Sequence, residues 1–552
     1  MPPPDNDDTQ LEDDAASQPI SVPDSGDAGE SGKLKMIISL LKKCLGVKDI
    51  ASMRLSLPAS LLEPIPNLEY WHYLDRPDLF AAINDSDDPF ERMLAVLRFT
   101  FSKDLKFIRG KVCKPYNSVL GEHFRSHWDV LPVEYPSDPT APPIQHLYLT
   151  PPAAESSYSS LALTPAQAPR VSVSETASLS GRSVKSGKSG ASGLSLASRA
   201  TSTAGKSTPA TSPSLGEMNL DADMSNLNLA DDASEVTELV EADDSPNAKG
   251  KQRVRIAFLT EQVSHHPPVS AYYAKCASRH VELAGIDQIS AKVSGTTLRI
   301  VPGSYNQGLF VKLTGGPGAG ETYHITHPIG SVNGMFRGSF YITMGEATII
   351  ECTGGNDDEE QLRAIIEYKE ESWIGKAHFL VEGVIHTYKP GETQHEEWTR
   401  VKHVPRSRIL ATFDGSWKHK IRWKRVNAPS SEYATLIDLS TLHVIPKSVR
   451  SLEKQLPDES RKLWDNVTTR LQAKEYGEAT RHKLAIEQRQ RDEAAERKRK
   501  GIQFVPKYFE SDYEAGQPTL TKAGRLALEE ELQEDIVYPL EDSSTPSTPS
   551  TP

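Results

Sequence analysis

The chain has 552 residues, of which 37% are hydrophobic and 7% aromatic, and its formal net charge at pH 7 is −13. Globular chains usually contain about 45–50% apolar residues by a count that also includes Gly, so part of this length is expected to lie outside a packed core. The negative charge argues against a nucleic-acid-binding protein, because such proteins need a surplus of Lys and Arg. The four cysteines are far apart, so neither a disulfide framework nor a metal site is predicted.

The N-terminal residues 1–32 are acidic and contain proline, unlike a signal peptide, and they are expected to form a disordered tail. No run of about 18 apolar residues is present, so no segment is predicted to span a bilayer. Unpaired cysteines fit a reducing compartment. We therefore expect a cytoplasmic protein whose membrane contact is peripheral.

Residues 33–152 are expected to be mostly helical. A helix over Lys33–Leu45 has an apolar face of Leu34, Ile37, Ile38 and Leu41 with lysines beside it. Such a helix is suited to lie on an anionic membrane, although packing against a protein core would produce the same pattern. A second helix is predicted over Pro89–Phe107, with a stripe of Phe90, Met93, Leu94, Leu97 and Phe101.

A long polar segment interrupts the chain after this region. Residues 153–250 are rich in Ser, Thr, Ala and Gly, a composition too polar to pack a core, and are predicted to be a disordered insert. The tail 516–552 is expected to be disordered at its Thr-Pro end. Ser-Pro and Thr-Pro sites at Thr208, Ser212 and Ser245 indicate that kinases could target the insert, as they could the tail.

The second half of the chain changes from helical to strand periodicity. Short β-rich segments punctuated by Gly, Pro and Asn-Gly predict a mostly β fold, a large antiparallel sheet or barrel with flanking helices. After Trp423 the chain is expected to return to helix, over Ser460–Leu471 and over Ala479–Lys500, with Gly501 ending the latter. The predicted strands are Val254–Val263, Val269–Lys275, Thr297–Val301, Leu309–Leu313, Ser339–Ile342, Ala364–Tyr368, Phe379–Thr387 and Ile409–Phe413.

Between the first two of these strands stands the sequence Glu-Gln-Val-Ser-His-His-Pro-Pro, residues 261–268. Pro267 disfavours helical geometry at His266, so a strand-to-turn corner is predicted. The two imidazoles, His265 and His266, could face an anion from a rigid rim, or they could only satisfy local hydrogen bonds.

Residues 261–268 resemble the eight-residue fingerprint of the oxysterol-binding protein family without a substitution. Residues 114–122, Lys-Pro-Tyr-Asn-Ser-Val-Leu-Gly-Glu, are similar to a second family element, with Ser118 where proline is usual. Lys483, Glu487 and Arg491 recur every four residues, as in the family, and this spacing puts them on one helix face. The resemblance covers about 34–152 and 250–515, so the lipid-binding domain is expected to comprise 33–152, including the lid, and 251–515.

The resemblance implies a lipid-binding β-barrel with an N-terminal lid, without catalytic residues or cofactors. Family members exchange phosphatidylinositol 4-phosphate for a sterol or phosphatidylserine between membranes, which predicts a peripheral location at endoplasmic reticulum, Golgi or plasma membrane contact sites. Cations and histidines suit a phosphate monoester. By position, the head-group residues would be Lys114, Asn117, His265, His266, Lys483, Glu487 and Arg491.

The second lipid is less clearly specified. Leu57 and Leu61 match the tunnel segment of phosphatidylserine-binding relatives, although core packing would also explain them. Ala59 and Ala291 stand where those relatives have hydroxyls, and an unmet polar group costs about 1–3 kcal/mol. The sequence therefore favours a sterol over phosphatidylserine by a narrow margin.

Two other functions remain open from the sequence. A phosphoesterase would need a nucleophile or metal cluster beside the histidines, and none is found at ligand spacing. A lipid sensor or scaffold would bind without net transport. No pleckstrin-homology or ankyrin region precedes the lid, so a short-form member of the family is expected. Residues 508–512 resemble the family's endoplasmic-reticulum tether motif only weakly.

Overall fold

The computed structural model describes residues 59–109, 114–144, 253–294, 297–334, 341–355, 360–371, 377–426 and 432–533, with the short stretches 20–21, 39, 55–57, 146–148 and 240–241. All of them belong to one compact unit, formed by 1–168 together with 238–552. The predicted lid helix lies outside the described residues except for Ser39.

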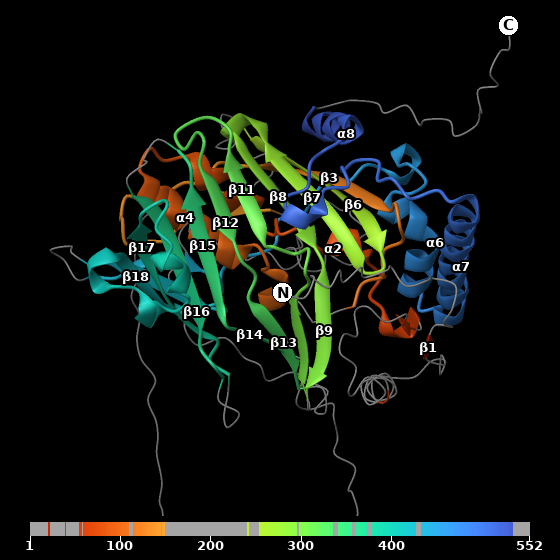
Figure 1. Cartoon of the computed structure of the whole chain (residues 1–552), viewed down its shortest axis with the longest axis horizontal. Helices are drawn as coiled ribbons and strands as arrows, with labels where there is room; N and C mark the ends of the chain where they lie inside the picture. The colour runs from red at the N-terminus through yellow and green to blue at the C-terminus, as the bar shows by residue number, and fades with distance from the viewer. Residues whose placement is uncertain are drawn as a thin grey trace, which may run out of the picture. The chain divides into compact units, whose positions relative to one another are not determined.

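Twelve of the described strands form one antiparallel sheet in the order β20-β19-β18-β17-β16-β15-β12-β11-β8-β7-β6-β3 (Figure 1). The prediction of a mostly β, antiparallel fold with flanking helices is thus confirmed. The strands are β3 (His123–Val130), β6 (Val254–His265), β7 (Pro268–Cys276), β8 (Val281–Asp287), β11 (Leu309–Leu313), β12 (Thr322–Ile325), β15 (Ala347–Thr353), β16 (Gln361–Tyr368), β17 (Leu380–Tyr388), β18 (Ile409–Ser416), β19 (Lys420–Arg425) and β20 (Ala434–Asp438).

A second described sheet, in the order β14-β13-β10-β9, continues strands of the first beyond a bend. Gln288 alone separates β8 from β9, and Glu346, with φ 63°, alone separates β14 from β15. Two further pairs are short and parallel. These strands are β9 (Ile289–Ser294), β10 (Thr297–Pro302), β13 (Ile329–Asn333), β14 (Tyr341–Gly345), β1 (Ile20–Ser21) with β2 (Leu55–Ser56), and β4 (His146–Leu147) with β5 (Val240–Glu241).

The edge strands β20 and β3 share no ladder within the described residues, and the chain after β20 runs to β3 instead. His127 and Ser448 exchange backbone hydrogen bonds of 3.1 and 2.8 Å, and the Trp128 indole donates to the carbonyl of Ile445. The side chains of Leu442, Val444 and Ile445 are buried in the main core. This segment covers the interior between the two edge strands.

Helices lie on both sides of the large sheet. α4 lies behind it in Figure 1 and is buried on every side rather than on one stripe, with Phe90, Met93, Leu94, Leu97 and Phe101 in the main core. α6 and α7 stand side by side at one edge of the unit. The helices are α2 (Asn67–Tyr70), α3 (Pro77–Ala81), α4 (Pro89–Ser102), α5 (Lys106–Arg109), α6 (Ser460–Gln472), α7 (Tyr476–Lys500) and α8 (Lys522–Leu532).

Three features differ from the sequence-based expectations. β3 lies within the region expected to be mostly helical, and β20 follows Trp423, where only helix was expected. α8 lies beyond 515, where we ended the lipid-binding domain, and it packs on the outer face of β6. That strand is buried on both faces, because Ile256 and Phe258 point into the main core whereas Ala257 and Leu259 contact the layer that contains α8.

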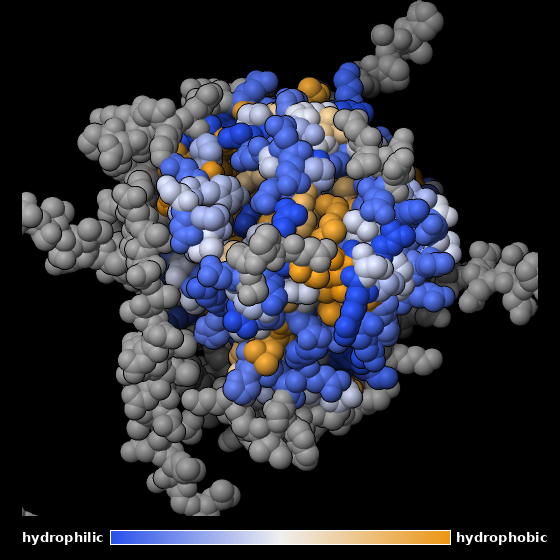
Figure 2. Space-filling model, turned by 90° about the vertical axis from the view of Figure 1, so that its left-hand side faces the viewer, coloured by the Kyte–Doolittle hydropathy of each residue, from blue (hydrophilic) through white to orange (hydrophobic). Residues whose placement is uncertain are grey.

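The outer surface is mostly hydrophilic, with one exception in view. On the side of the unit that carries β17 and β18, hydrophobic residues gather in a strip between hydrophilic ones (Figure 2). Leu380, the first residue of β17, is exposed.

Candidate functional site

The three motifs found in the sequence are joined by hydrogen bonds. Gly121 donates its N–H to the carbonyl of Gln262 at 3.0 Å, and Gln262 donates to the carbonyl of Glu122 at 2.8 Å. The N–H of Leu120 donates to the amide oxygen of Gln490, on α7, at 3.2 Å. Segment 114–122, the histidine fingerprint and α7 therefore meet at one place, although more than a hundred residues separate each from the next.

Glu122 is a structural centre of this junction. Its fully buried carboxylate accepts from the N–H of Val119 at 3.0 Å, the indole of Trp464 at 3.0 Å and the hydroxyl of Ser460 at 2.7 Å. Burial raises the pKa of this carboxyl to about 7, against the effect of the three donors. Glu122 thus fixes α6 to segment 114–122.

The fingerprint forms the hairpin between β6 and β7, as its prolines predict. His265 is paired with Pro268 across the turn, and the rings of His265 and His266 lie edge to face with centroids 4.6 Å apart. Both histidines are half-buried. Glu261 faces the other way, because its buried carboxylate accepts from the backbone N–H groups of Lys507 and Tyr508, each at 2.7 Å.

The predicted cations on α7 differ in their surroundings. Lys483 is 4% exposed and forms an ion pair with Glu487 at 2.5 Å, whereas Arg491, two turns along the same face, is exposed and donates to the amide oxygen of Gln488. A buried cation is unusual without a partner in reach. The ion pair holds Lys483 in the position that the family resemblance assigns to a head-group ligand.

Lys114 and Asn117 lie at the start of their segment and are both exposed. The ammonium group of Lys114 donates to the side-chain oxygen of Asn117 at 2.6 Å and to the carbonyl of Pro115 at 3.0 Å. The two predicted head-group residues are therefore in direct contact.

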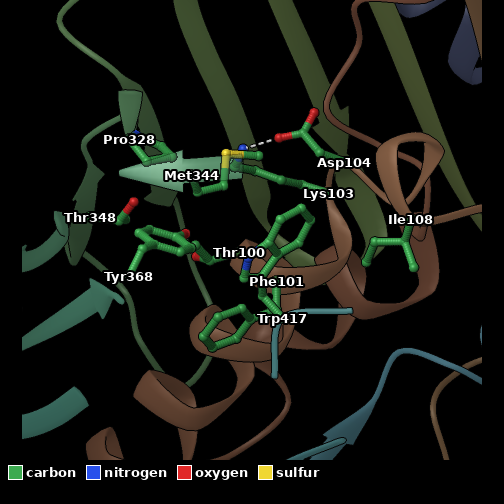
Figure 3. Close-up of a pocket in the computed structure, with 10 residues that line it drawn as sticks. All are labelled: Thr100, Phe101, Lys103, Asp104, Ile108, Pro328, Met344, Thr348, Tyr368 and Trp417. Carbon is green, nitrogen blue, oxygen red and sulfur yellow. Dashed lines mark hydrogen bonds and ion pairs between the residues drawn. The ribbon is translucent and has the colours of Figure 1, made fainter. Parts of the chain in front are cut away.

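Two adjacent cavities, of about 120 and 40 Å³, lie between α4 and the strands that bend into the second sheet. Both are lined by Lys103, Asp104, Pro328 and Met344. In the smaller cavity, the ion pair of Lys103 and Asp104 stands at one end and aromatic side chains surround the other (Figure 3). Its remaining lining residues are Thr100, Phe101, Ile108, Thr348, Tyr368 and Trp417.

The charges at these cavities are arranged so that they neutralise one another. Burial disfavours ionisation of Asp104, but Lys103 and Lys106 outweigh it and hold the pKa of the carboxyl well below its usual range. Burial and the charge of Lys103 lower the pKa of His327 to about 3, so this imidazole is neutral. Its Nε2 atom is buried and has no hydrogen-bond partner. The larger cavity therefore offers one unpartnered polar atom, the Nε2 of His327, to the polar group of an otherwise apolar ligand.

Lys103 and Asp104 were missed by the sequence analysis. The signal was present, since two charged residues follow the apolar run of α4 directly, but the pattern alone equally fits a solvated helix end. Of the predicted tunnel residues, Leu57 is half-buried against a separate cluster that includes Trp464 and Val467, and neither Leu57 nor Leu61 lines the two cavities. Leu34, Ile37, Ile38 and Leu41 lie outside the described residues.

Within the described ranges, no helix has the length and apolar character needed to cross a bilayer. The same ranges contain no cluster of His, Cys, Asp and Glu side chains able to hold a metal ion.

Comparison with known proteins assigns the chain to a family. The family model described as "Oxysterol-binding protein" matches residues 36–149 and 234–530. The chain belongs to the oxysterol-binding protein family. It is 39% identical to oxysterol-binding protein-like protein 1 of Schizosaccharomyces pombe over 92% of this chain and 93% of that protein. It is 25% identical to oxysterol-binding protein-related protein 9 of Mus musculus, over 91% of this chain but only 51% of the longer mouse protein.

A solved structure of the Osh1 ORD domain in complex with cholesterol has a TM-score of 0.50 and 17% sequence identity, covering 91% of this chain and 90% of that one. This likeness supports the oxysterol-binding fold. Proteins of the oxysterol-binding family bind and transfer lipids and are not enzymes, so family membership confirms the prediction of a non-enzymatic lipid-binding protein.

Proposed function

We propose that this protein carries one lipid at a time between membranes, exchanging phosphatidylinositol 4-phosphate for a sterol. The observation that carries the proposal is the junction of segment 114–122, the histidine hairpin and α7 through Gly121, Gln262 and Gln490. The three segments that meet there carry cations and imidazoles, the groups that suit a phosphate monoester. Seven residues would form the head-group site: Lys114, Asn117, His265, His266, Lys483, Glu487 and Arg491.

The head-group site is tested by replacing both histidines with alanine. Each lost contact to a charged group costs about 1.5–3 kcal/mol, so the double variant should extract phosphatidylinositol 4-phosphate from liposomes with at least about tenfold lower affinity. His403→Ala with His419→Ala is the matched control, because both histidines are exposed and belong to β17–β19 connections. Unchanged extraction by the folded His265 and His266 variant would contradict the proposal.

A sterol suits the two cavities better than phosphatidylserine. Their walls are largely aromatic and aliphatic, and the charge of Asp104 is already balanced by its ion pairs with Lys103 and Lys106. A serine head group would bring an ammonium and a carboxylate that both need new partners once removed from water. A sterol brings one hydroxyl, for which the unpartnered Nε2 of His327 is a candidate contact.

Parallel transfer assays between liposomes decide between these lipids. A fluorescent sterol should move faster in the presence of the protein, and phosphatidylinositol 4-phosphate in the acceptor membrane should increase the rate. Movement of a phosphatidylserine probe without movement of the sterol would reverse the assignment. Binding of either lipid without any transfer would support a sensor or scaffold instead.

A further inference from the structure

The end of α7 and the residues after it form a basic and apolar surface that the lipid-binding motifs do not include. Residues 497–507, Arg-Lys-Arg-Lys-Gly-Ile-Gln-Phe-Val-Pro-Lys, contain five cations and no carboxylate, in a chain whose net charge is −13. Glu496, one residue earlier, pairs with Arg499 and Lys500 and balances part of this charge. The stretch 496–507 therefore keeps a surplus of four positive charges.

Two aliphatic side chains stand open to solvent among these cations. Val505 is 77% exposed, more than any other large hydrophobic residue in the part of the chain that the structure describes, and Ile502 is 57% exposed. Single exposed hydrophobic residues are common on proteins. Here two of them lie three residues apart and are flanked by five cations.

The surface is held firmly at both ends. α7 ends at Gly501, whose φ of 65° lets the chain turn back sharply. At the other end, the carboxylate of Glu261 accepts the N–H groups of Lys507 and Tyr508. Between them, the ring of Phe504 lies against Gly121, where a Cβ atom would come within 3.3 Å of it. Ile502 and Val505 are thus presented by a fixed loop.

These anchors also place the surface beside the head-group site. Glu261 is the first residue of the histidine fingerprint, and Gly121 belongs to segment 114–122. A membrane that contacted residues 496–507 would therefore lie next to the proposed head-group site.

We infer that residues 496–507 are a docking surface for an anionic membrane, in which Ile502 and Val505 enter the interface while the surrounding Lys and Arg contact acidic head groups. Cations near an anionic bilayer and short apolar side chains in its interface stabilise adsorption together. A nucleic acid would use the cations but not the aliphatic side chains. This surface would act whichever lipid the protein carries, so the inference goes beyond the proposed cargo exchange.

Vesicle flotation of the full chain tests the surface, with phosphatidylcholine vesicles prepared with and without phosphatidylglycerol, which is not a proposed cargo. The unmodified protein should float with the anionic vesicles only. Ile502→Ser with Val505→Ser, and separately Lys498→Gln with Lys500→Gln, should each lower the bound fraction at least about fivefold. Added salt should weaken binding of the unmodified protein, and it should weaken binding of the lysine variant less steeply.

Two matched controls accompany these variants. Leu526→Ser removes a similarly exposed aliphatic side chain from α8, and Lys312→Gln with Lys389→Gln removes two exposed lysines from the sheet region. Both controls should float like the unmodified protein. Unchanged flotation of the folded 502/505 variant would overturn the inference, as would equal binding to neutral vesicles, and neither result would bear on lipid extraction.

Discussion

The residues of the family motifs fall into two groups that differ in exposure and hydrogen bonding. Lys114, Asn117 and the two histidines are at least partly exposed, whereas Glu122 and Glu261 are buried and accept hydrogen bonds from the protein itself. The sequence of a motif does not separate these two groups of residues. Burial and the direction of the hydrogen bonds do.

The raised pKa of Glu122 predicts a pH-dependent stability. A carboxyl whose pKa rises from 4.5 to about 7 on folding stabilises the protein below pH 4.5, and this contribution is lost as the pH rises through 7. Glu122→Gln removes the titration, while its amide can accept from Val119 and Trp464 and donate to Ser460. At pH 8 the variant should therefore unfold at a higher temperature than the parent, and its free energy of unfolding should be higher by roughly 3 kcal/mol at most.

The comparison should be made by thermal unfolding from pH 4 to 8. The difference between Glu122→Gln and the parent should shrink toward zero below pH 4.5. Glu122→Ala is the informative contrast, because it removes the acceptor of the Val119 N–H and of the Trp464 indole and should be destabilising at every pH. A difference between Gln and Glu that did not change with pH would show that the carboxyl does not titrate in this range.

At the scale of elements, the short helix α8 packs on the outer face of the large sheet and forms ion pairs with it. Leu528 is 3% exposed and packs on the outer face of β6, and Glu530 and Glu531 bind Arg125 and His127 of β3. Thr521 caps the helix by accepting the N–H of Gly524 at 3.1 Å. α8 thus makes the lipid-binding domain extend beyond residue 515.

Replacing Leu528 with alanine should lower the free energy of unfolding by about 2–5 kcal/mol, because it leaves a cavity between α8 and β6. Leu526→Ala, on the exposed side of the same helix, should change it by less than about 0.5 kcal/mol. Urea unfolding of both variants measures the difference. Equal stabilities would mean that α8 does not contribute to the domain in solution.

At the scale of the whole molecule, the long insert begins and ends close together. His146 and Leu147 of β4 pair in parallel with Val240 and Glu241 of β5, so the two ends of the insert meet at a short ladder. The closure entropy of a flexible loop rises slowly, by about 0.6 kcal/mol for each doubling of its length. Shortening the insert should therefore leave the domain intact.

Deletion of residues 153–235, which spares β5, should leave the melting temperature and the extraction of phosphatidylinositol 4-phosphate nearly unchanged. Differential scanning fluorimetry and liposome extraction provide the two measurements. A deletion that also removes Val240 and Glu241 is the control for the ladder itself. Unfolding of the 153–235 variant would require that residues of the insert belong to the core.

The sequence by itself determined the features that depend on local patterns. A short β-rich run between Gly308 and Gly315 placed β11 at Leu309–Leu313 with its observed bounds. The prolines of the fingerprint predicted a hairpin corner, and Gly501 ended α7 as expected from its freedom to adopt positive φ. The family motifs, read from 261–268 and 114–122, identified the class of protein. Each of these signals lies within a few residues along the chain.

Only the tertiary structure decided which segments meet. An apolar stripe predicted one buried face for α4, but the sheet and the chain after β20 enclose the helix on all sides. Lys103 and Asp104 therefore became a buried ion pair at a cavity instead of a solvated helix end. β3 became a strand through its pairing with β6, in which Val130 lies opposite Val254, 124 residues later in the chain. The physical reason is that burial depends on contacts between distant segments, which a pattern within one segment does not specify.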